Sequence, residues 1–270
     1  MISIGKTEKY INDRLEDRGA LLFSLIDPVD YKSVKDVIAT AKAVTKGGAD
    51  VLLLGGSSGV QGELLDGVAK EIKDAIDGVP LVLFPGNVAT ITRYADAIYF
   101  QSLLNSRNPY WHAQVQMLGA PVVKEAGIEP LPVGYILIEP GGTAAWVGDA
   151  NIVPQSKPKI AAALALTGQY LGNRFIVTDT GSNPRMQGKG PIPPEMVREV
   201  KRAIDVPYIV GGGIISEKEL RVAYEAGADA VQIGTAFEGS NKADDVYKKA
   251  LLFSKVTKEE GAKKLKKGGK

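Results

Sequence analysis

The sequence predicts a (β/α)8 barrel in a single domain. Short runs rich in Val, Ile, Leu and Phe recur along the chain, and each is followed by a longer stretch with helical periodicity. This alternation predicts parallel strands joined by crossover helices, and continuous apolar strands suit burial on both faces. Eight such units in about 250 residues match the size of a barrel. A doubly wound sheet is the structural alternative.

The eight strands are predicted at residues 20–26, 51–54, 81–84, 97–100, 133–138, 175–178, 208–210 and 230–233. Helices are predicted at residues 31–46, 66–76, 157–171, 194–204 and 217–226, several of them preceded by Asp, Ser or Pro, which favour helix starts. Residues 105–119 are interpreted as an insertion between strands four and five. No interior linker divides the chain, so we assign residues 1–254 to the barrel and residues 255–270 to a Lys-rich tail.

The composition limits which partners, metal sites and catalytic groups the protein could have. The 270 residues include 33 Lys and Arg against 31 Asp and Glu, a balance that argues against a disordered chain and against a nucleic-acid partner. The absence of Cys excludes disulfides, thiolate zinc sites and cysteine nucleophiles, and the single His112 excludes a polyhistidine metal centre. A metal would therefore need oxygen ligands, which favours a hard cation such as Mg²⁺.

Location is predicted from two absences. No apolar run approaches the ~20 residues that cross a bilayer, and the first residues lack the apolar segment of a secretory signal. We therefore expect a cytoplasmic protein. The tail at 255–270 contains seven Lys and two Glu. Such an end is usually a solvated, poorly ordered terminus, although clustered Lys also attract anionic membrane surfaces.

Glycine motifs follow the last two predicted strands. Gly211, Gly212 and Gly213 come after strand seven, and Gly234 and Thr235 come after strand eight. Barrels commonly bind phosphate at these two strand ends through backbone N–H groups. Each motif alone is equally well explained by a tight turn. Their occurrence together favours a phosphate site.

The segment after strand six adds polar groups beside that predicted phosphate site. It reads Asp179, Thr180, Gly181, Ser182 and Asn183. A carboxylate repels phosphate, so Asp179 makes more sense as a contact to a hydroxyl of the same ligand, whose proton it would accept. The alternative is an Asp that caps the following turn.

Asp27 and Ser57 follow strands one and two, which are neighbours in a barrel. A carboxylate and a hydroxyl, completed by waters and ligand phosphates, form the sparse coordination shell that Mg²⁺ accepts. Taken alone, the pair Asp27–Pro28 is more often a turn than a metal site.

Aromatic residues gather in the middle of the chain. Tyr94, Tyr99, Trp111 and Trp146 lie near strand ends or the predicted insertion, where they would line an apolar ligand groove. Burial in the core is the more common explanation for such residues. His112 lies within a predicted helix over 109–117, and we favour a structural role over a general base.

Several segments identify a resemblance that runs nearly end to end. They are Leu-Ile-Asp-Pro at 25–28, Gly-Gly-Ser-Ser-Gly-Val at 55–60, Leu-Asn-Ser at 104–106, Trp-His-Ala at 111–113, Gly-Tyr-Ile at 134–136, Gly-Ser at 181–182, Gly-Gly-Gly-Ile at 211–214 and Gly-Thr at 234–235. By these residues the chain resembles the geranylgeranylglyceryl phosphate synthases, barrel prenyltransferases of ether-lipid synthesis. The Asn-Ser and Trp-His-Ala segments are the most specific part.

The resemblance implies transfer of a C20 prenyl group from geranylgeranyl diphosphate to the C3 hydroxyl of sn-glycerol 1-phosphate, with Mg²⁺ as cofactor. It implies that Asp27 and Ser57 hold the metal and that Asp179 contacts and deprotonates the glycerol. It also implies a homo-oligomer, dimer or hexamer, with peripheral membrane contact. The glycerol phosphate would be held by Gly181, Ser182, Gly211, Gly212, Gly234 and Thr235, with Thr180 and Asn183 beside them.

The chain departs from the family pattern in three ways. Val29 and Asp30 stand where an acidic residue followed by Lys or Arg is common, and Val177 stands where a Tyr is common. Asp179 replaces the usual Glu, so its carboxylate is set back by about one methylene.

Three alternatives stay open. The same chemistry with a longer, heptaprenyl donor is the nearest. A phosphate-binding isomerase or flavin-dependent barrel would share the two glycine motifs. A barrel that binds phosphorylated ligands without catalysis is the third, and the pair Asp27 and Ser57 argues against it.

Overall fold

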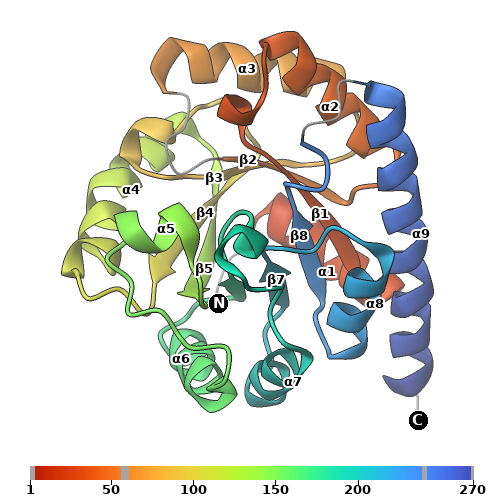
Figure 1. Cartoon of the computed structure of the whole chain (residues 1–270). Coiled ribbons are helices and arrows are strands. Elements are labelled where there is room, and N and C mark those ends of the chain that lie inside the picture. The colour runs from red at the N-terminus through yellow and green to blue at the C-terminus, as the bar shows by residue number, and fades with distance from the viewer. Residues whose placement is uncertain (1–3, 56–60, 239–241, 269–270) are drawn as a thin grey trace. The chain divides into compact units, whose positions relative to one another are not determined.

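The eight strands form a closed barrel in sequence order, from β1 to β8 (Figure 1). The computed structural model describes residues 4–55, 61–238 and 242–268. Every strand pair whose register is defined is parallel. The predicted barrel is therefore confirmed, and the doubly wound sheet is excluded because its order would not close. The strands are β1 Leu21–Ile26, β2 Val51–Gly55, β3 Leu81–Phe84, β4 Ala97–Leu103, β5 Glu129–Leu137, β6 Phe175–Asp179, β7 Tyr208–Gly211 and β8 Ala230–Ile233.

Helices alternate with the strands. The α-helices are α1 Lys6–Arg18, α2 Val34–Lys46, α3 Gly62–Ala75, α4 Gln114–Ala126, α5 Gly142–Val147, α6 Pro158–Tyr170, α7 Pro194–Ala203, α8 Glu217–Glu225 and α9 Ala243–Gly268. Four short 3-10 helices are η1 Pro28–Asp30, η2 Val88–Thr90, η3 Pro109–Trp111 and η4 Pro184–Gln187. The five predicted helices correspond to α2, α3, α6, α7 and α8, whereas the pattern missed α1, α5 and α9 and predicted only the start of α4. In the described residues no helix is long and apolar enough to span a membrane.

The segment predicted as an insertion between strands four and five has a simpler structure. Most of its second half belongs to α4, the crossover helix, which begins at Gln114. Only the loop before α4 is additional, and it contains η3. The predicted helix over 109–117 is thus two separate elements, and His112 lies between them.

The chain divides into two compact units, which are described separately. The first comprises Met1–Tyr99, Leu118–Leu131 and Phe237–Lys270, and the second comprises Phe100–Met117 and Pro132–Ala236. The first unit contains β1, β2 and β3, and the second contains β6, β7 and β8.

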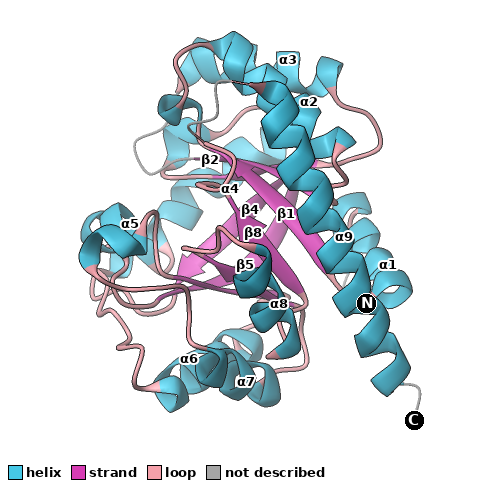
Figure 2. Ribbon diagram, turned by 45° about the vertical axis from the view of Figure 1, so that its right-hand side comes forward, coloured by secondary structure: helices cyan, strands magenta, loops and turns pink. Residues whose placement is uncertain are grey.

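In the first unit α9 packs along α2 and β1 (Figures 1 and 2). Its inner face presents Val246, Phe253 and Val256, each at most 2% exposed. Gly261 lies where α9 passes the end of α1, since a Cβ there would meet the carbonyl oxygen of Arg18. Burial of this apolar stripe is what orders the helix.

The predicted boundary between residues 254 and 255 falls inside α9. Residues 255–268 continue the helix, and Val256, Thr257 and Glu260 are at most 3% exposed. The expectation of a solvated, poorly ordered end is therefore wrong for residues 255–261, whereas residues 262–267 continue the helix and are mostly exposed. The many Lys residues concealed an apolar spacing that places one face against the barrel.

In the second unit β5, β6, β7 and β8 are paired in one continuous register. At the carboxyl end, Leu137 pairs with Asp179, Asp179 with Gly211, and Gly211 with Gln232. The helices α6 and α7 pack side by side on this unit (Figure 1). The register brings Asp179, Gly211 and Gln232, which lie at or near the carboxyl ends of β6, β7 and β8, to one level.

Candidate active site

Asp179 is the buried acid of the second unit. It is the last residue of β6 and is 7% exposed. Its Oδ1 accepts a hydrogen bond from the backbone N–H of Gly181 at 2.7 Å, and its Oδ2 accepts one from Nε2 of Gln232 at 2.9 Å. Tyr135 also donates its hydroxyl to this carboxylate. The side chain is therefore held by the loop that follows β6 and by residues of β8 and β5.

Burial and hydrogen bonding act in opposite directions on this carboxyl group. Burial raises the pKa of Asp179 above its ordinary value, and the hydrogen bonds from Gly181, Gln232 and Tyr135 lower it. Burial is the larger effect, so the net direction is upward. A carboxylate with a raised pKa is a better proton acceptor than one free in water, which suits a general base.

Tyr135 bears on one of the three departures from the family pattern, the Val at residue 177. Val177 has no hydroxyl group to offer the site, and its side chain is completely buried. Tyr135 pairs with Val177 in the register of β5 and β6 and supplies a hydroxyl from the neighbouring strand. Because the two residues lie on different strands, a reading of residue 177 alone could not have found it.

Close packing explains two of the glycines after β7. A Cβ on Gly211 would lie 2.6 Å from Nε2 of Gln232 and 2.7 Å from Oδ2 of Asp179. A Cβ on Gly212 would meet Thr180 and would lie 2.7 Å from Oδ1 of Asp179. Neither the tight turn nor the phosphate site that the sequence suggests accounts for this close approach. The two glycines make room for the Asp179 carboxylate.

The loop after β5 packs directly on the loop after β6. The N–H of Gly141 donates to the carbonyl of Thr180 at 3.0 Å. A Cβ on Gly181 would lie 2.6 Å from the carbonyl oxygen of Gly141. Gly181 also has φ of 77°, a region that favours glycine. The segment predicted to bind glycerol phosphate is thus fixed by backbone contacts.

Several backbone N–H groups around this loop have no hydrogen-bond partner among the described residues. Gly212 and Gly213 have φ of 86° and 74°. Within the described residues, the N–H groups of Ser182, Gly212 and Gly213 make no hydrogen bond. Unpaired N–H groups at the ends of barrel strands are suited to bind a phosphate.

The other residues predicted around the phosphate are less constrained. Gly234 and Thr235 form a turn after β8, and Asn183 begins η4 with φ of 50°. Ser182 and Asn183 are exposed, whereas Thr180 is completely buried, with its hydroxyl bonded to no described group. Binding of glycerol phosphate by these residues stays a prediction.

Arg185 anchors the loop that contains Gly212 and Gly213, and the sequence analysis did not identify it. Its guanidinium donates to the carbonyl of Gly213 at 2.5 Å and forms an ion pair with Glu219. Glu219 in turn accepts from the N–H of Ser216 at 3.1 Å in a capping box at the start of α8. Arg185 follows η4's first residue, far from Gly213 in sequence, so only the fold reveals this contact.

Asp27 lies in the first unit, directly after β1. Its Oδ1 accepts from the N–H of Val29 at 3.3 Å, so the turn that was the alternative for Asp27 and Pro28 is present, with Asp27 capping η1. Burial, together with the nearby Asp30 carboxylate, raises the pKa of Asp27 to about 6. Ser57, the other predicted metal ligand, lies outside the described residues.

The donor chemistry around Asp27 fits a magnesium ion held mainly by its ligand. A desolvated carboxylate with a second carboxylate nearby is stabilised by a divalent cation. No group of three His, Cys, Asp or Glu side chains within the described ranges could hold a metal ion. A cation here would therefore need oxygens from the substrate, as the sparse shell predicted from the sequence requires.

The four aromatic residues predicted to line a groove have different environments. Tyr99 is 1% exposed and packs edge to face with Phe84 at 5.3 Å between ring centroids, which fits the core interpretation. Tyr94 is 36% exposed. Trp111 is half-buried and packs on Tyr110, whereas Trp146 on α5 is 87% exposed.

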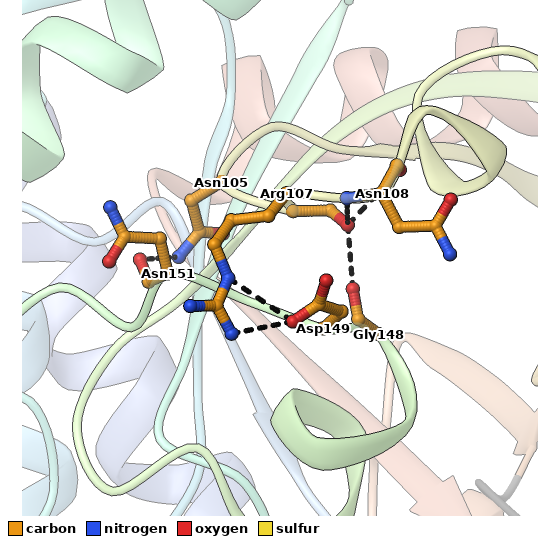
Figure 3. A network of polar contacts seen from close by, with 7 residues as sticks. Asn105, Arg107, Asn108, Gly148, Asp149 and Asn151 are labelled. Carbon is orange, nitrogen blue, oxygen red and sulfur yellow. Dashed lines mark hydrogen bonds and ion pairs between the residues drawn. The ribbon is translucent and has the colours of Figure 1, made fainter.

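Asn105 and Ser106 anchor the loop after β4 to neighbouring segments by hydrogen bonds (Figure 3). Asn105 donates through Nδ2 to the carbonyl of Asn151, as Figure 3 shows. The same Nδ2 donates to the carbonyl of Leu137, and Oδ1 accepts from the N–H of Leu137. Ser106 donates to the carbonyl of Gly148 at 2.6 Å. These bonds tie the loop after β4 to the end of β5 and to the segment after α5.

His112 makes a further hydrogen bond within the same loop. Its Nε2 lies 2.8 Å from the carbonyl oxygen of Ser106 and donates to it. The residue is exposed. The favoured structural role is therefore supported, although through loop anchoring and not through the packing that the sequence suggested.

Comparison with known proteins assigns the chain to a family. The model of the PcrB family matches residues 14–252. Geranylgeranylglyceryl phosphate synthase of Pyrococcus abyssi is 48% identical over 250 residues, 92% of this chain and 96% of that protein. The chain belongs to the PcrB family.

Solved structures agree with that assignment. The crystal structure of (S)-3-O-geranylgeranylglyceryl phosphate synthase from Thermoplasma acidophilum, in complex with sn-glycerol-1-phosphate, superposes with a TM-score of 0.86 at 31% identity. The superposition covers 96% of this chain and 100% of the Thermoplasma acidophilum chain. Thiamine phosphate pyrophosphorylase from Pyrococcus furiosus, at 14% identity and a TM-score of 0.58, shares the fold alone.

Proposed function

We infer that the chain is a prenyltransferase that joins the C3 hydroxyl of sn-glycerol 1-phosphate to geranylgeranyl diphosphate. The observation that carries this conclusion is the 48% identity to the Pyrococcus abyssi synthase over 92% of the chain. The likeness to a synthase with sn-glycerol-1-phosphate bound supports the choice of acceptor. The products are geranylgeranylglyceryl phosphate and diphosphate, and the reaction belongs to ether-lipid biosynthesis.

The second unit supplies what the acceptor needs. The N–H groups of Ser182, Gly212 and Gly213 are free to bind its phosphate, and Asp179 is buried beside them. In the reaction, the bond between the prenyl C1 and the diphosphate oxygen breaks with its electrons leaving on diphosphate. The acceptor oxygen forms the new bond to C1, and its proton passes to the Asp179 carboxylate.

Asp27 and Ser57 are the proposed metal-holding residues for the donor. Mg²⁺, when bound there, supplies positive charge that offsets the charge developing on the departing diphosphate. The desolvated Asp27 carboxylate and the oxygen-only donor set support this assignment. Asp27 itself would bind the cation and orient the diphosphate end of the donor.

The prenyl tail needs an apolar, dry environment because water would quench an allylic cation. Trp111, Tyr94 and Trp146 remain the proposed lining, whereas Tyr99 is 1% exposed and belongs to the core. The donor and product are lipids, which supports peripheral membrane contact. The Lys-rich end of α9, with Lys263, Lys264, Lys266 and Lys267 along its last turns, supports the same proposal.

Self-association and location are also proposed. Exposed apolar side chains on α4, namely Met117, Leu118 and Val122, are between 40% and 63% exposed and form an apolar patch of the kind that becomes an interface. We propose a homo-oligomer, dimer or hexamer, in the cytoplasm. Sedimentation analysis that finds only a monomer at micromolar concentration would contradict it.

A transfer assay tests the proposed function. Purified protein with Mg²⁺ is incubated with radiolabelled sn-glycerol 1-phosphate and, separately, with farnesyl, geranylgeranyl or heptaprenyl diphosphate. Label extracted into the organic phase, greatest with the C20 donor, is the expected result. A preference for the heptaprenyl donor would correct the chain length, and no label with any donor from folded protein would refute the function.

A further inference from the structure

Gln232 is a buried amide in an otherwise apolar strand. Its neighbours on β8 are Ala230, Val231 and Ile233, and Gln232 itself is 3% exposed. Its Nε2 donates to Oδ2 of Asp179 at 2.9 Å, and no donor in the described part of the chain reaches its Oε1. An unpaired amide oxygen is unfavourable in a core. The bond to Asp179 is thus the feature for which this residue type is suited.

Three strands are arranged around this one bond. Asp179 pairs with Gly211, and Gly211 pairs with Gln232, so the two side chains lie on either side of the glycine. A Cβ on Gly211 would be within 2.7 Å of both bonding atoms. The hydrogen bond therefore crosses the space that a side chain at residue 211 would fill.

We propose that Gln232 is a positioning residue of the acceptor site, which holds the Asp179 carboxylate in the orientation that accepts the proton of the glycerol hydroxyl. The proposal rests on the proposed function. Gly181 fixes Oδ1 and Gln232 fixes Oδ2, so the carboxylate cannot turn about its own axis. The bond from Gln232 also lowers the pKa of Asp179 and keeps the charged, basic form populated against the effect of burial.

The geometry makes Asp179 and Gln232 a coupled pair. An added methylene at residue 179 would push the carboxylate into the Gln232 amide, which is already at hydrogen-bond distance. Asp179→Glu alone should therefore be impaired. The double variant Asp179→Glu with Gln232→Ala should recover part of the activity, because the smaller side chain gives the longer acid room.

The principal test compares Gln232→Met, which keeps the length and removes the donor, with wild type. We expect kcat for prenyl transfer to fall about 10- to 100-fold, in the range for loss of one preorganised donor or somewhat less. KM for geranylgeranyl diphosphate should be unchanged, and the acid limb of the kcat profile should move to higher pH. Gln232→Glu, which places a second acid beside Asp179, should move it further in the same direction.

Gln169→Leu is the matched control. Gln169 also bonds an aspartate, accepting from the N–H of Asp205 at 2.7 Å and donating to its carboxylate at 3.2 Å, but it lies on α6. This variant should leave kcat and the pH profile as in wild type. Circular dichroism and thermal melts establish that each variant is folded.

A second readout does not depend on turnover. Carbon-13 NMR of γ-labelled aspartate, with the Asp179 signal assigned by its loss in Asp179→Asn, follows the titration of this carboxyl group directly. We expect its midpoint at higher pH in Gln232→Met than in wild type. An unchanged midpoint and an unchanged kcat profile would overturn the proposal. If the wild type transfers no prenyl group, the proposed function fails, and the NMR titration alone decides the role of Gln232.

Discussion

Asp179 and Asp27 both follow a barrel strand, yet their surroundings differ sharply. Asp179 is 7% exposed and receives hydrogen bonds from Tyr135 on β5, from Gln232 on β8 and from Gly181 in the loop after β6. Asp27 is half-buried, receives one long hydrogen bond from the following turn, and has the Asp30 carboxylate nearby. On the proposed function, the acceptor side would be completed by the protein alone. We propose that the donor side, where two carboxylates lie near each other, needs a cation and its ligand to be complete.

Loss of Asp179 should have the largest effect. Asp179→Asn keeps the size of the side chain and removes its basicity, so kcat should fall about 10²- to 10⁴-fold, the usual contribution of a general base. The radiolabel transfer assay measures this at saturating concentrations of both substrates. A variant that retains more than half of the wild-type kcat would show that the proton is accepted elsewhere.

Loss of Asp27 should have the next largest effect, and of a different kind. Asp27→Asn should lower activity about 100-fold at fixed Mg²⁺, since metal charge on a leaving group is worth several kcal/mol. Higher Mg²⁺ concentration should restore part of the rate, whereas it should not rescue Asp179→Asn. Equal responses of the two variants to Mg²⁺ would remove the distinction between the two sites.

The hydrogen bonds of Asn105, beside the acceptor site, should contribute to the stability of the fold. Asn105→Ala breaks three buried or half-buried hydrogen bonds, including both to Leu137, the residue paired with Asp179. We expect a loss of about 1–3 kcal/mol in unfolding free energy, measured by denaturant titration. Arg107→Ala is the matched control, because its ion pair with Asp149 is exposed and should contribute less than about 1 kcal/mol. The opposite ranking would contradict the importance of the buried contacts.

The smallest predicted effect is a difference in melting temperature that depends on pH. The pKa of Asp179 is raised in the folded protein, so its contribution to stability is greatest below the ordinary pKa of an aspartate and is lost as pH rises through the folded value. Asp179→Asn should therefore melt above wild type at pH 8, and the difference should shrink toward pH 4. A wild type that gains on the variant as pH rises would contradict this sign.

The sequence was informative wherever local pattern decides structure. All eight strands and the closed order follow from short apolar runs that alternate with amphipathic helices. Asp27 and Asp179 could be singled out because they directly follow strands. The α9 helix was missed because Lys residues mask its apolar face, which only packing on α2 and β1 makes visible.

The contacts that shape the acceptor site could not be predicted in the same way. Tyr135, Arg185 and Gln232 are all far along the chain from the groups they bind. Each contact depends on the register of neighbouring strands or on loop packing, which no local pattern encodes. The resemblance to a family directed attention to residue 177 for a hydroxyl that the structure supplies from Tyr135.

Calorimetric titration with sn-glycerol 1-phosphate, with Mg²⁺ and with EDTA in its place, tests the contrast between the two sites most directly. An acceptor site completed by the protein alone should bind this ligand with the same affinity in both buffers, and Asp27→Asn should bind it as wild type does. Binding that disappears in EDTA, or that is lost in Asp27→Asn, would contradict the account.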